Sequence, residues 1–383
     1  MKKLAVLLVF IVVANNFARS QVTATALPDS IYTGNQGTFH VQGVAVDHDN
    51  GHVYFSFTNK LIKTDLDGKL IGSVTGFVGH LGDLDFNTDD GKVYGSLEYK
   101  NDAIGKGINK TLGVEARAQN GFYIAIFDGS KIVRPDMDAE TEDVLTTVHL
   151  QEPVNDYEAT VKMGSEEIKH RFACSGIDGV AIGPAFGKPN SKKKYLYVAY
   201  GIYGDKNRTD NDHQIILKYD IRKWSRFYEN LSQGELHRSG PKKPLKKYFV
   251  KTGNTRWGVQ SLAYDSYTGH FFAAVYRGSK PIYPNYDLFV MDGHKKAKTT
   301  YVQSDNKNIK VKGLSLLEAG SKDNASGIRG WHFKWGATGL CPLGDGLFYI
   351  SHDLKSKDGQ QQSTVHKYRW VGDGEVAFVL ERE

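Results

Sequence analysis

The sequence is poor in the residues that hold many small exported proteins together. It contains 2 cysteines, 4 methionines and 10 prolines in 383 residues. Cys174 and Cys341 are too few for a disulfide framework, so a buried core must supply the stability. Neither has a second cysteine two or three residues away, which argues against a cysteine-based metal site. We expect Cys341, in an apolar strand pattern, to be a buried free thiol; one bridge between the two cysteines is the alternative.

Strong net charge and long apolar runs are also missing. The formal charge is +6, and no cluster forms the dense basic stripe of a nucleic-acid binder. The lysines of 192–194 and 242–247 are interpreted as solvated loops, so nucleic acid is not an expected partner. No segment approaches the roughly 20 apolar residues of a membrane span. A weak preference for anionic ligands is all that the charge predicts.

The first 20 residues have the three zones of an export signal. Lys2 and Lys3 precede an apolar run over 4–14, and a stretch of small residues ends at Ser20. We expect cleavage after residue 20 and a mature protein that is secreted or periplasmic; a retained N-terminal anchor is the alternative. The remaining residues, 21–383, are predicted to form one domain and a monomer.

What the sequence does have is aromatic residues and an internal repeat. It holds 21 Tyr, 19 Phe and 5 Trp, a composition typical of strands. Residues 40–57 read HVQGVAVDHDNGHVYFSF and residues 80–97 read HLGDLDFNTDDGKVYGSL, so the same features return forty residues later. Each copy predicts two strands joined by a turn that Gly51 or Gly91 closes. A third copy occupies 257–276, and looser copies occupy 176–201 and 336–351.

Each inner hairpin is followed by two further strand patterns, and this predicts an all-β propeller of five four-stranded blades. The third strands are expected at 61–65, 122–128, 215–220, 288–292 and 365–370, and the fourth at 69–74, 146–150, 246–250, 299–302 and 376–380. Insertions at 100–121, 151–173, 201–212, 221–244 and 305–333 lengthen the blades unevenly. Six or seven blades would need strands hidden in these insertions. Residues 22–38 are expected to cover an outer edge.

The repeat resembles that of secreted propellers of the gluconolactonase-like and NHL-like superfamily. The resemblance rests on the strand Gly-Val-Ala-Val-Asp over 43–47 and the turn Asp-Leu-Asp-Gly over 65–68. It implies the fold and not the activity, since the acidic and asparagine metal ligands of its esterase members have no residue-by-residue match here. In broad architecture the chain is also similar to polysaccharide-degrading propellers, including lyases and glycosidases.

A propeller brings the start of each inner strand and the end of the next strand to one face, around the axis. The candidate site residues follow from this rule and from the aromatic-rich segment 326–336. Candidate catalytic residues are His40, His80, Tyr99, Tyr200 and Arg277. Candidate substrate-binding residues are Gln42, Asp83, Glu98, Asp178, Tyr203, Gln260, Arg329, Trp331, His332, Trp335 and His352.

Three chemistries fit this set. In the favoured one, a lyase or dehydratase reaction on uronate-containing oligo- or polysaccharide, His40 or His80 is the base, Tyr99 or Tyr200 the acid, and Arg277 neutralises the uronate. In a glycoside hydrolase, carboxylates among Asp83, Glu98 and Asp178 would act as a pair. Alternatively, His40, His80, His352 and Asp353 would bind a divalent metal ion. A non-catalytic carbohydrate-binding propeller is the rival to all three.

Overall fold

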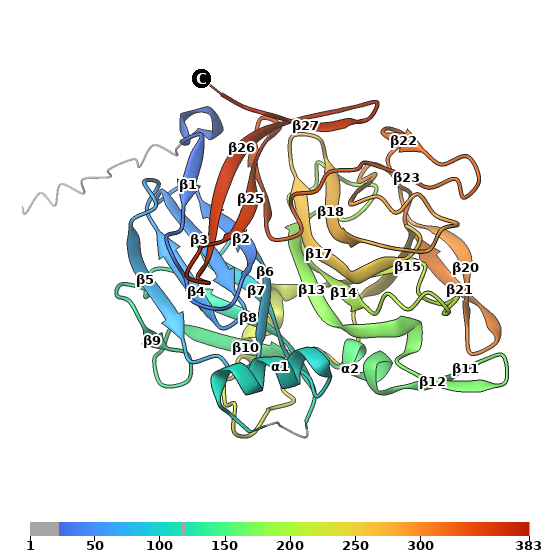
Figure 1. Ribbon diagram of the computed structural model, residues 1–383, viewed down its shortest axis with the longest axis horizontal. Coiled ribbons are helices and arrows are strands. Elements are labelled where there is room, and N and C mark those ends of the chain that lie inside the picture. The colour runs from blue at the N-terminus through green and yellow to red at the C-terminus, as the bar shows by residue number, and fades with distance from the viewer. Residues whose placement is uncertain (1–22, 116–118, 383) are drawn as a thin grey trace, which may run out of the picture.

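The computed structural model describes residues 23–115 and 119–382 (Figure 1). The predicted export signal over 1–20 lies outside the described residues. In the described part of the chain, no helix is long and apolar enough to cross a membrane.

Five inner strands form a closed ring. They are β2 (Val41–Asp47), β6 (His80–Asn87), β13 (Cys174–Gly183), β17 (Thr255–Asp265) and β24 (Leu340–Gly344). In this order each contacts the next, and β24 contacts β2. Each begins its own antiparallel sheet. The predicted five-bladed β-propeller is therefore confirmed, and no blade arises from the insertions.

The outer strands complete the five blades in chain order. The first blade adds β3 (His52–Phe57), β4 (Lys60–Thr64), β5 (Leu70–Thr75) and β9 (Met137–Asp138), and the second adds β7 (Lys92–Tyr99), β8 (Gly121–Asp128) and β10 (Leu145–His149). The third adds β14 (Tyr195–Ile202), β15 (His213–Tyr219) and β16 (Lys246–Lys251), and the fourth β18 (His270–Arg277) and β19 (Leu288–Met291). The fifth adds β25 (Leu347–Lys355), β26 (Gln361–Asp373) and β27 (Val376–Leu380).

One outer strand belongs to a different blade from the one predicted. The segment 299–302, expected as the fourth strand of the fourth blade, lies in β20 (Lys298–Ser304), which pairs with β21 (Lys307–Gly313). That hairpin joins the third blade, because the end of β21 pairs in parallel with the middle of β16, and Ile309 and Val311 of β21 pack on the third blade's core. The edge of β19 is instead covered by single bridges to Leu316 and Trp331.

The first strand in the described chain belongs to the last blade. β1 (Ser30–Tyr32) pairs with β26 of the fifth blade, with buried Ile31 opposite Val365. Figure 1 shows this first strand, in blue, beside the last blade, in red. Residues 22–38 were expected to cover an outer edge, and in the structure the described part of this segment supplies an edge strand.

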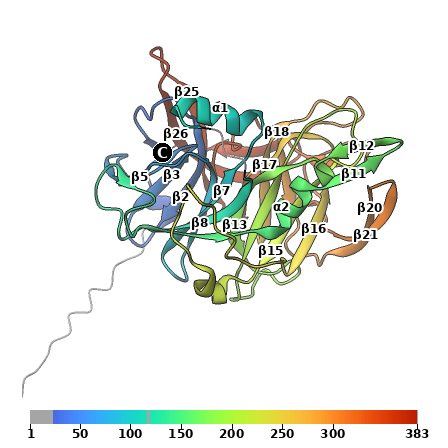
Figure 2. The same ribbon diagram turned by 90° about the horizontal axis from the view of Figure 1, so that it is seen from below.

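The insertions carry the helices and short hairpins. They contain α1 (Ala103–Leu112), α2 (Gln151–Glu158), β11 (Thr160–Met163), β12 (Glu166–Lys169), β22 (Ser321–Lys322) and β23 (Arg329–Gly330). Short 3-10 helices span Ala24–Ala26, Arg171–Ala173 and Ile221–Phe227. Seen from below in Figure 2, α1 and the β25–β26 hairpin rise at the same edge of the molecule.

The core lies between neighbouring blades. One cluster joins Ile124 and Val148 of the second blade to Val180 and Val198 of the third. The aromatic content fills these contacts, as expected for sheets that bury both faces. Cys174 and Cys341 are buried free thiols, so the prediction for Cys341 is confirmed and no disulfide joins them.

Candidate functional site

A cavity of about 380 Å³ opens where the inner strands begin, at the face that carries α1. It is lined by Phe39, His40, Gln42, Thr58, His80, Glu98, Lys100, Ala103, Ile104, Gly107, Ile108, Thr111, Ser175, Asp178, Trp257, Gln260 and Tyr276. These residues come from the first four blades and from α1. The axial cavity, as we call it, is therefore built from strand ends that the fold gathers at one opening.

A cluster of ionisable side chains forms one wall of the axial cavity. His80 Nδ1 lies 3.7 Å from Glu98 Oε1 and 3.8 Å from Asp178 Oδ1. Gln260 donates to Asp178 Oδ2 at 2.9 Å, and the backbone amide of Ile177 donates to Glu98 Oε2 at 3.0 Å. The second, third and fourth blades thus hold two carboxyl groups against one imidazole.

Lys100 connects this cluster to α1. Its ammonium group forms an ion pair with Glu98 Oε1 and lies 3.7 Å from Asp102 Oδ2. Asp102 caps the helix by accepting from the amide of Gly105 at 2.9 Å, and it also accepts from the Tyr203 hydroxyl at 2.7 Å. The helix that walls the cavity is therefore fixed to the charged cluster through Asp102.

The surroundings shift the pKa values of the three ionisable side chains in the cluster by different amounts. Burial raises the pKa of Glu98 to about 7, although Lys100 and the Ile177 amide oppose this shift. Burial, and then the charge of Glu98, raise the pKa of Asp178 well above its usual range. Burial and nearby Lys100 lower the pKa of His80 to about 3, so its imidazole is neutral at neutral pH. One carboxyl group, Asp178, is consequently set to keep a proton while Glu98 faces a cation.

The same cluster offers ligands for a metal ion. In the described residues, His80, Glu98 and Asp178 form the group of metal-type side chains whose ligand atoms all lie within 4.8 Å of one another. The Lys100 ammonium already balances Glu98 there, so a metal ion would compete with it. The earlier candidate set of His40, His80, His352 and Asp353 is not brought together as such a group.

Several predicted site residues do meet in the axial cavity. His40, Gln42, His80, Glu98, Asp178 and Gln260 line it. Tyr203 lies beside it, with its ring 6.0 Å from that of Trp257. Their roles in catalysis or binding stay predictions.

Two predicted tyrosines face away from the cavity. Tyr99 is buried and donates to Gln233 Oε1 at 2.9 Å. Tyr200 is fully buried between blades, where its hydroxyl donates to Asp156 Oδ2 at 3.1 Å. Neither lines the axial cavity, because each is one residue out of phase with the strand face that does.

Arg277 and the segment 326–336 also lie outside the axial cavity. Arg277 donates to both oxygens of Asp287, at 3.1 and 2.8 Å, and His332 Nδ1 lies 3.4 Å from the same carboxylate. Trp331 is buried in the core, and Arg329 donates to the carbonyl of Gly320 at 3.4 Å.

In the fifth blade, Trp335 and His352 stack on each other. Their ring centroids are 3.8 Å apart, and His352 also shares a hydrogen bond of 2.9 Å with the Tyr368 hydroxyl. This pair does not line the axial cavity.

Asp83 connects neighbouring blades through hydrogen bonds. It accepts from the amides of Val180 at 3.0 Å and Leu262 at 2.8 Å, and from the Ser261 hydroxyl at 3.1 Å. Burial raises its pKa well above the usual range. Since Asp83 is almost completely buried and surrounded by these donors, its hydrogen bonds connect neighbouring blades and do not face the axial cavity.

Most residues that line the axial cavity were not among the candidate catalytic and binding residues, and Lys100, Tyr276 and Trp257 are three of these. Lys100 follows Glu98 by two positions, Tyr276 precedes Arg277, and Trp257 starts the third repeat copy. Alternation along the strand was the available signal for Lys100 and Tyr276.

Fold and site together define a five-bladed β-propeller with an acidic cluster at its axis. The sequence matches no family model and no curated protein. The gluconolactonase-like character of the repeat therefore stays a resemblance.

Among solved structures, the chain is similar to the GH43_1 enzyme from Xanthomonas citri complexed with xylose, at 10% identity and a TM-score of 0.41 over 94% of this chain and 95% of that chain. A protein of unknown function from Bacteroides caccae matches at 8% identity and a TM-score of 0.32, over 76% and 99% of the two chains. The Dos1 propeller matches at 12% identity and a TM-score of 0.29, over 90% and 82%. At such scores the function must be argued from the site itself.

Proposed function

We propose that the protein is an exported glycoside hydrolase whose reacting pair is Glu98 and Asp178. The observation that carries the proposal is the placement of two buried carboxyl groups in one cavity, with ligand oxygens within 4.8 Å of each other. Glu98 forms an ion pair with Lys100 and Asp178 does not, which is the asymmetry that acid–base catalysis by two carboxyls requires. Export rests on the pattern of residues 1–20.

In the proposed reaction, Asp178 gives its proton to the leaving glycosidic oxygen as the bond from that oxygen to the anomeric carbon breaks. The ionised form of Glu98, which the charge of Lys100 stabilises against the effect of burial, attacks the anomeric carbon. Water then hydrolyses the glycosyl–Glu98 ester, and Asp178 takes up the proton of that water. The short separation favours this retaining course, because inverting enzymes need about 6.5–9.5 Å between the carboxyls to admit a water.

The other lining residues support a sugar as substrate. Phe39, Trp257 and Tyr276 offer rings for the apolar faces of a sugar. Gln42 and Gln260 offer amides for its hydroxyl groups. The volume of about 380 Å³ is within the usual range for a small-ligand site.

The test compares Glu98→Gln and Asp178→Asn with the unchanged protein on a panel of oligosaccharides. We expect each variant to lose about a thousandfold in the release of reducing ends, in line with the removal of a general acid or a nucleophile. Asp85→Asn is the matched control, because Asp85 is a carboxyl on β6, in the same blade as Glu98, that does not line the axial cavity. Equal turnover by the wild type and both variants would contradict the proposal, and binding without turnover would favour the lectin-like alternative.

A second candidate is β-elimination on uronate glycans, the reaction expected from the sequence. One observation favours it: His80 is neutral, and its Nδ1 has no hydrogen-bond partner among the described residues, in a cavity that also holds the Tyr276 hydroxyl. His80 would be the base and Tyr276 the acid, with Lys100 in place of Arg277 as the cation. Ultraviolet absorbance of an unsaturated product, in place of simple hydrolysis, would identify this reaction.

A further inference from the structure

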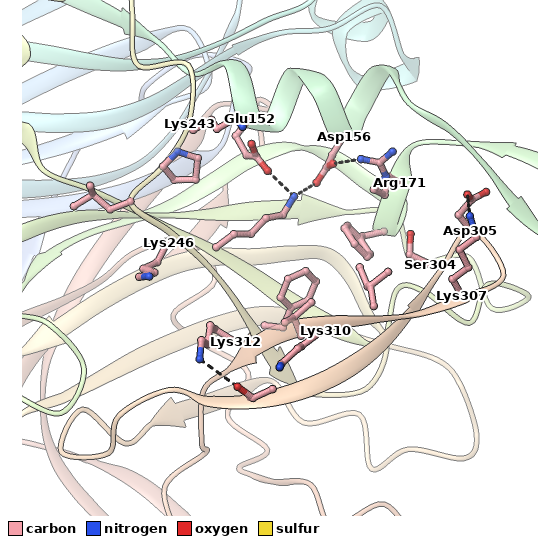
Figure 3. Close-up of a pocket in the computed structure, with 18 residues that line it drawn as sticks. Glu152, Asp156, Arg171, Lys243, Lys246, Ser304, Asp305, Lys307, Lys310 and Lys312 are labelled. Atoms are coloured by element: carbon pink, nitrogen blue, oxygen red, sulfur yellow. Dashed lines mark hydrogen bonds and ion pairs between the residues drawn. The ribbon is translucent and has the colours of Figure 1, made fainter.

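A second and larger hollow, of about 850 Å³, lies on the outer flank of the third blade (Figure 3). Its walls come from α2, β16, β21 and the residues just before β16. We call it the flank groove. It shares no lining residue with the axial cavity.

The β20–β21 hairpin, which lines the flank groove, is joined at its tip to the β11–β12 hairpin. Asp305 Oδ1 accepts from the amide of Lys162 at 2.9 Å, and Asn306 Oδ1 accepts from the amide of Gly164 at 2.8 Å. Asn306 Nδ2 donates back to the carbonyl of Gly164 at 2.7 Å. Both views of the molecule show β11–β12 and β20–β21 extending on the same side (Figures 1 and 2). These hydrogen bonds therefore fix the position of the two hairpins before a ligand binds.

The turn of the β20–β21 hairpin has a sequence suited to this task. Asp305 and Asn306 have φ values of 52° and 56°, the left-handed region that these two residue types tolerate best after glycine. Their side chains are thereby free to bond the other hairpin instead of completing their own turn.

The flank groove carries a marked excess of positive charge. Seven basic residues line it against three acidic ones, an excess of four in a chain whose total formal charge is +6. The two acids on α2, Glu152 and Asp156, form ion pairs with Lys247, and Asp156 forms another with Arg171 at 3.4 Å (Figure 3).

Four lysines of the groove form no ion pair with any described residue. They are Lys243, Lys246, Lys310 and Lys312, of which Lys312 donates to the Thr299 hydroxyl at 3.2 Å. Lys310 and Lys312 lie two residues apart on exposed positions of β21, so their stems start about 6.6 Å apart. Ammonium groups at such intervals suit a ligand with regularly repeated anions.

Apolar side chains lie between the charges. Leu245, Ile309 and Val311 line the flank groove together with the lysines. A chain of uronic acids presents carboxylates and the apolar C–H faces of its rings in alternation, which matches this mixture. Nucleic acid has a denser row of charge and would meet the acidic groups of the groove with less compensation.

We propose that the flank groove binds a uronic-acid polysaccharide, separately from the axial cavity. The inference shares with the proposed function only the class of ligand, a glycan. Bound there, an acidic chain would be retained by the protein whether or not the axial cavity cleaves it.

The test measures binding of polygalacturonate to the full mature chain at low and moderate salt. We expect the variant Lys243→Gln/Lys246→Gln/Lys310→Gln to lose about tenfold in affinity and to show a weaker dependence on salt. The matching triple Lys→Arg variant, which keeps the charges, should bind as the wild type does. The control is Lys69→Gln/Lys322→Gln/Lys357→Gln, three exposed lysines outside the groove, which should leave binding unchanged.

Three results would overturn the inference: no binding of polygalacturonate to the wild type, equal binding by the groove variant, or tighter binding of duplex DNA than of polygalacturonate. Failure of the proposed function is distinguishable from these. Glu98→Gln and Asp178→Asn should bind polygalacturonate normally, while the groove variant should still cleave short oligosaccharides.

Discussion

The Asp83 side chain lies at the centre of hydrogen bonds that connect four of the five blades. It starts in the second blade, yet its donors lie on the third and fourth, and Ser261 in turn accepts from the amide of Leu340 in the fifth at 3.1 Å. A buried acceptor of this kind satisfies backbone amides that the twist of the inner strands leaves unpaired. Its removal would leave several buried donors without a partner.

We predict that Asp83→Ala lowers the free energy of unfolding by about 3 kcal/mol or more, because each unsatisfied buried donor costs about 1–3 kcal/mol. Asp83→Asn should cost less than half as much, since its amide oxygen can still accept from Val180 and Leu262. Urea unfolding of both variants measures the difference. Equal losses would contradict this, because asparagine keeps the volume and one acceptor oxygen of aspartate, and neither would then contribute to stability at this position.

Single residues also explain where sequence reasoning succeeded and failed at the site. The strand-end rule found His80, Glu98 and Asp178 because they stand at the right ends of repeat copies. The same rule also selected the residues next to them along each strand, whose side chains point to the opposite face of the sheet. Glu98 and Lys100 share a face that excludes Tyr99. Similarly, a Cβ at Gly201 would lie 3.0 Å from Asp178 Oδ2, so the adjacent Tyr200 faces the core.

At the scale of elements, α1 determines the width of the axial cavity. Its cavity-facing positions include Ala103, Gly107 and Thr111, each four residues from the next. Gly105 cannot change, because a Cβ there would meet the carbonyl of Lys100 at 1.8 Å. A Cβ on Gly107 meets nothing within 4 Å, so this position can carry a larger side chain into the cavity.

We predict that Gly107→Leu abolishes most of the turnover while leaving the melting temperature unchanged or slightly higher. Leucine occupies cavity volume, and it favours the helix over glycine by about 0.8–1 kcal/mol. Lys110→Leu, exposed on the same helix and away from the cavity, is the control for added hydrophobicity. Full activity in Gly107→Leu would show that substrate does not enter beside α1.

The sequence predicted where the insertions lie but not the secondary structure within them. Strand periodicity fixed the blades, since copies of one pattern support each other. α1, α2 and β21 occur once each, so no repeat identified them, and β20 was predicted as a strand of the wrong blade. The β20–β21 hairpin joins the third blade because Ile309 and Val311 contact a core formed by residues distant in the sequence. A local sequence pattern carries no information about such a contact.

At the scale of the molecule, buried ionisable groups should shape the dependence of stability on pH. Burial raises the pKa of Asp85 and of Glu98 to about 7, so between their ordinary values and pH 7 the folded protein holds protons that the unfolded chain has lost. Stability falls with rising pH in that window. Burial lowers the pKa of His80 and His149 to about 3, and these neutral imidazoles lose stability as the pH falls below 6.5.

Between pH 6.5 and 8 the histidines of the unfolded chain lose their remaining protons, which adds stability and opposes the effect of the carboxyls. The contribution of one carboxyl therefore shows in the difference between variants. We predict that the melting temperature of the wild type falls by about 1 °C relative to that of Asp85→Asn over this range, because the variant lacks one of the protons released. Asp67→Asn, in an exposed turn, should behave as the wild type does. An identical pH dependence of the melting temperature in Asp85→Asn and the wild type would contradict the assigned burial effect.

The hairpin that leaves the fourth blade for the third has a consequence for how this gene can change. Residues 298–313 are encoded between segments of the fourth blade, yet they complete the edge of its neighbour. Duplicating or deleting the stretch of DNA for one blade would therefore expose strand edges in two. Such edges invite aggregation, so selection should keep this ring at its present size, even though its repeats look freely copyable.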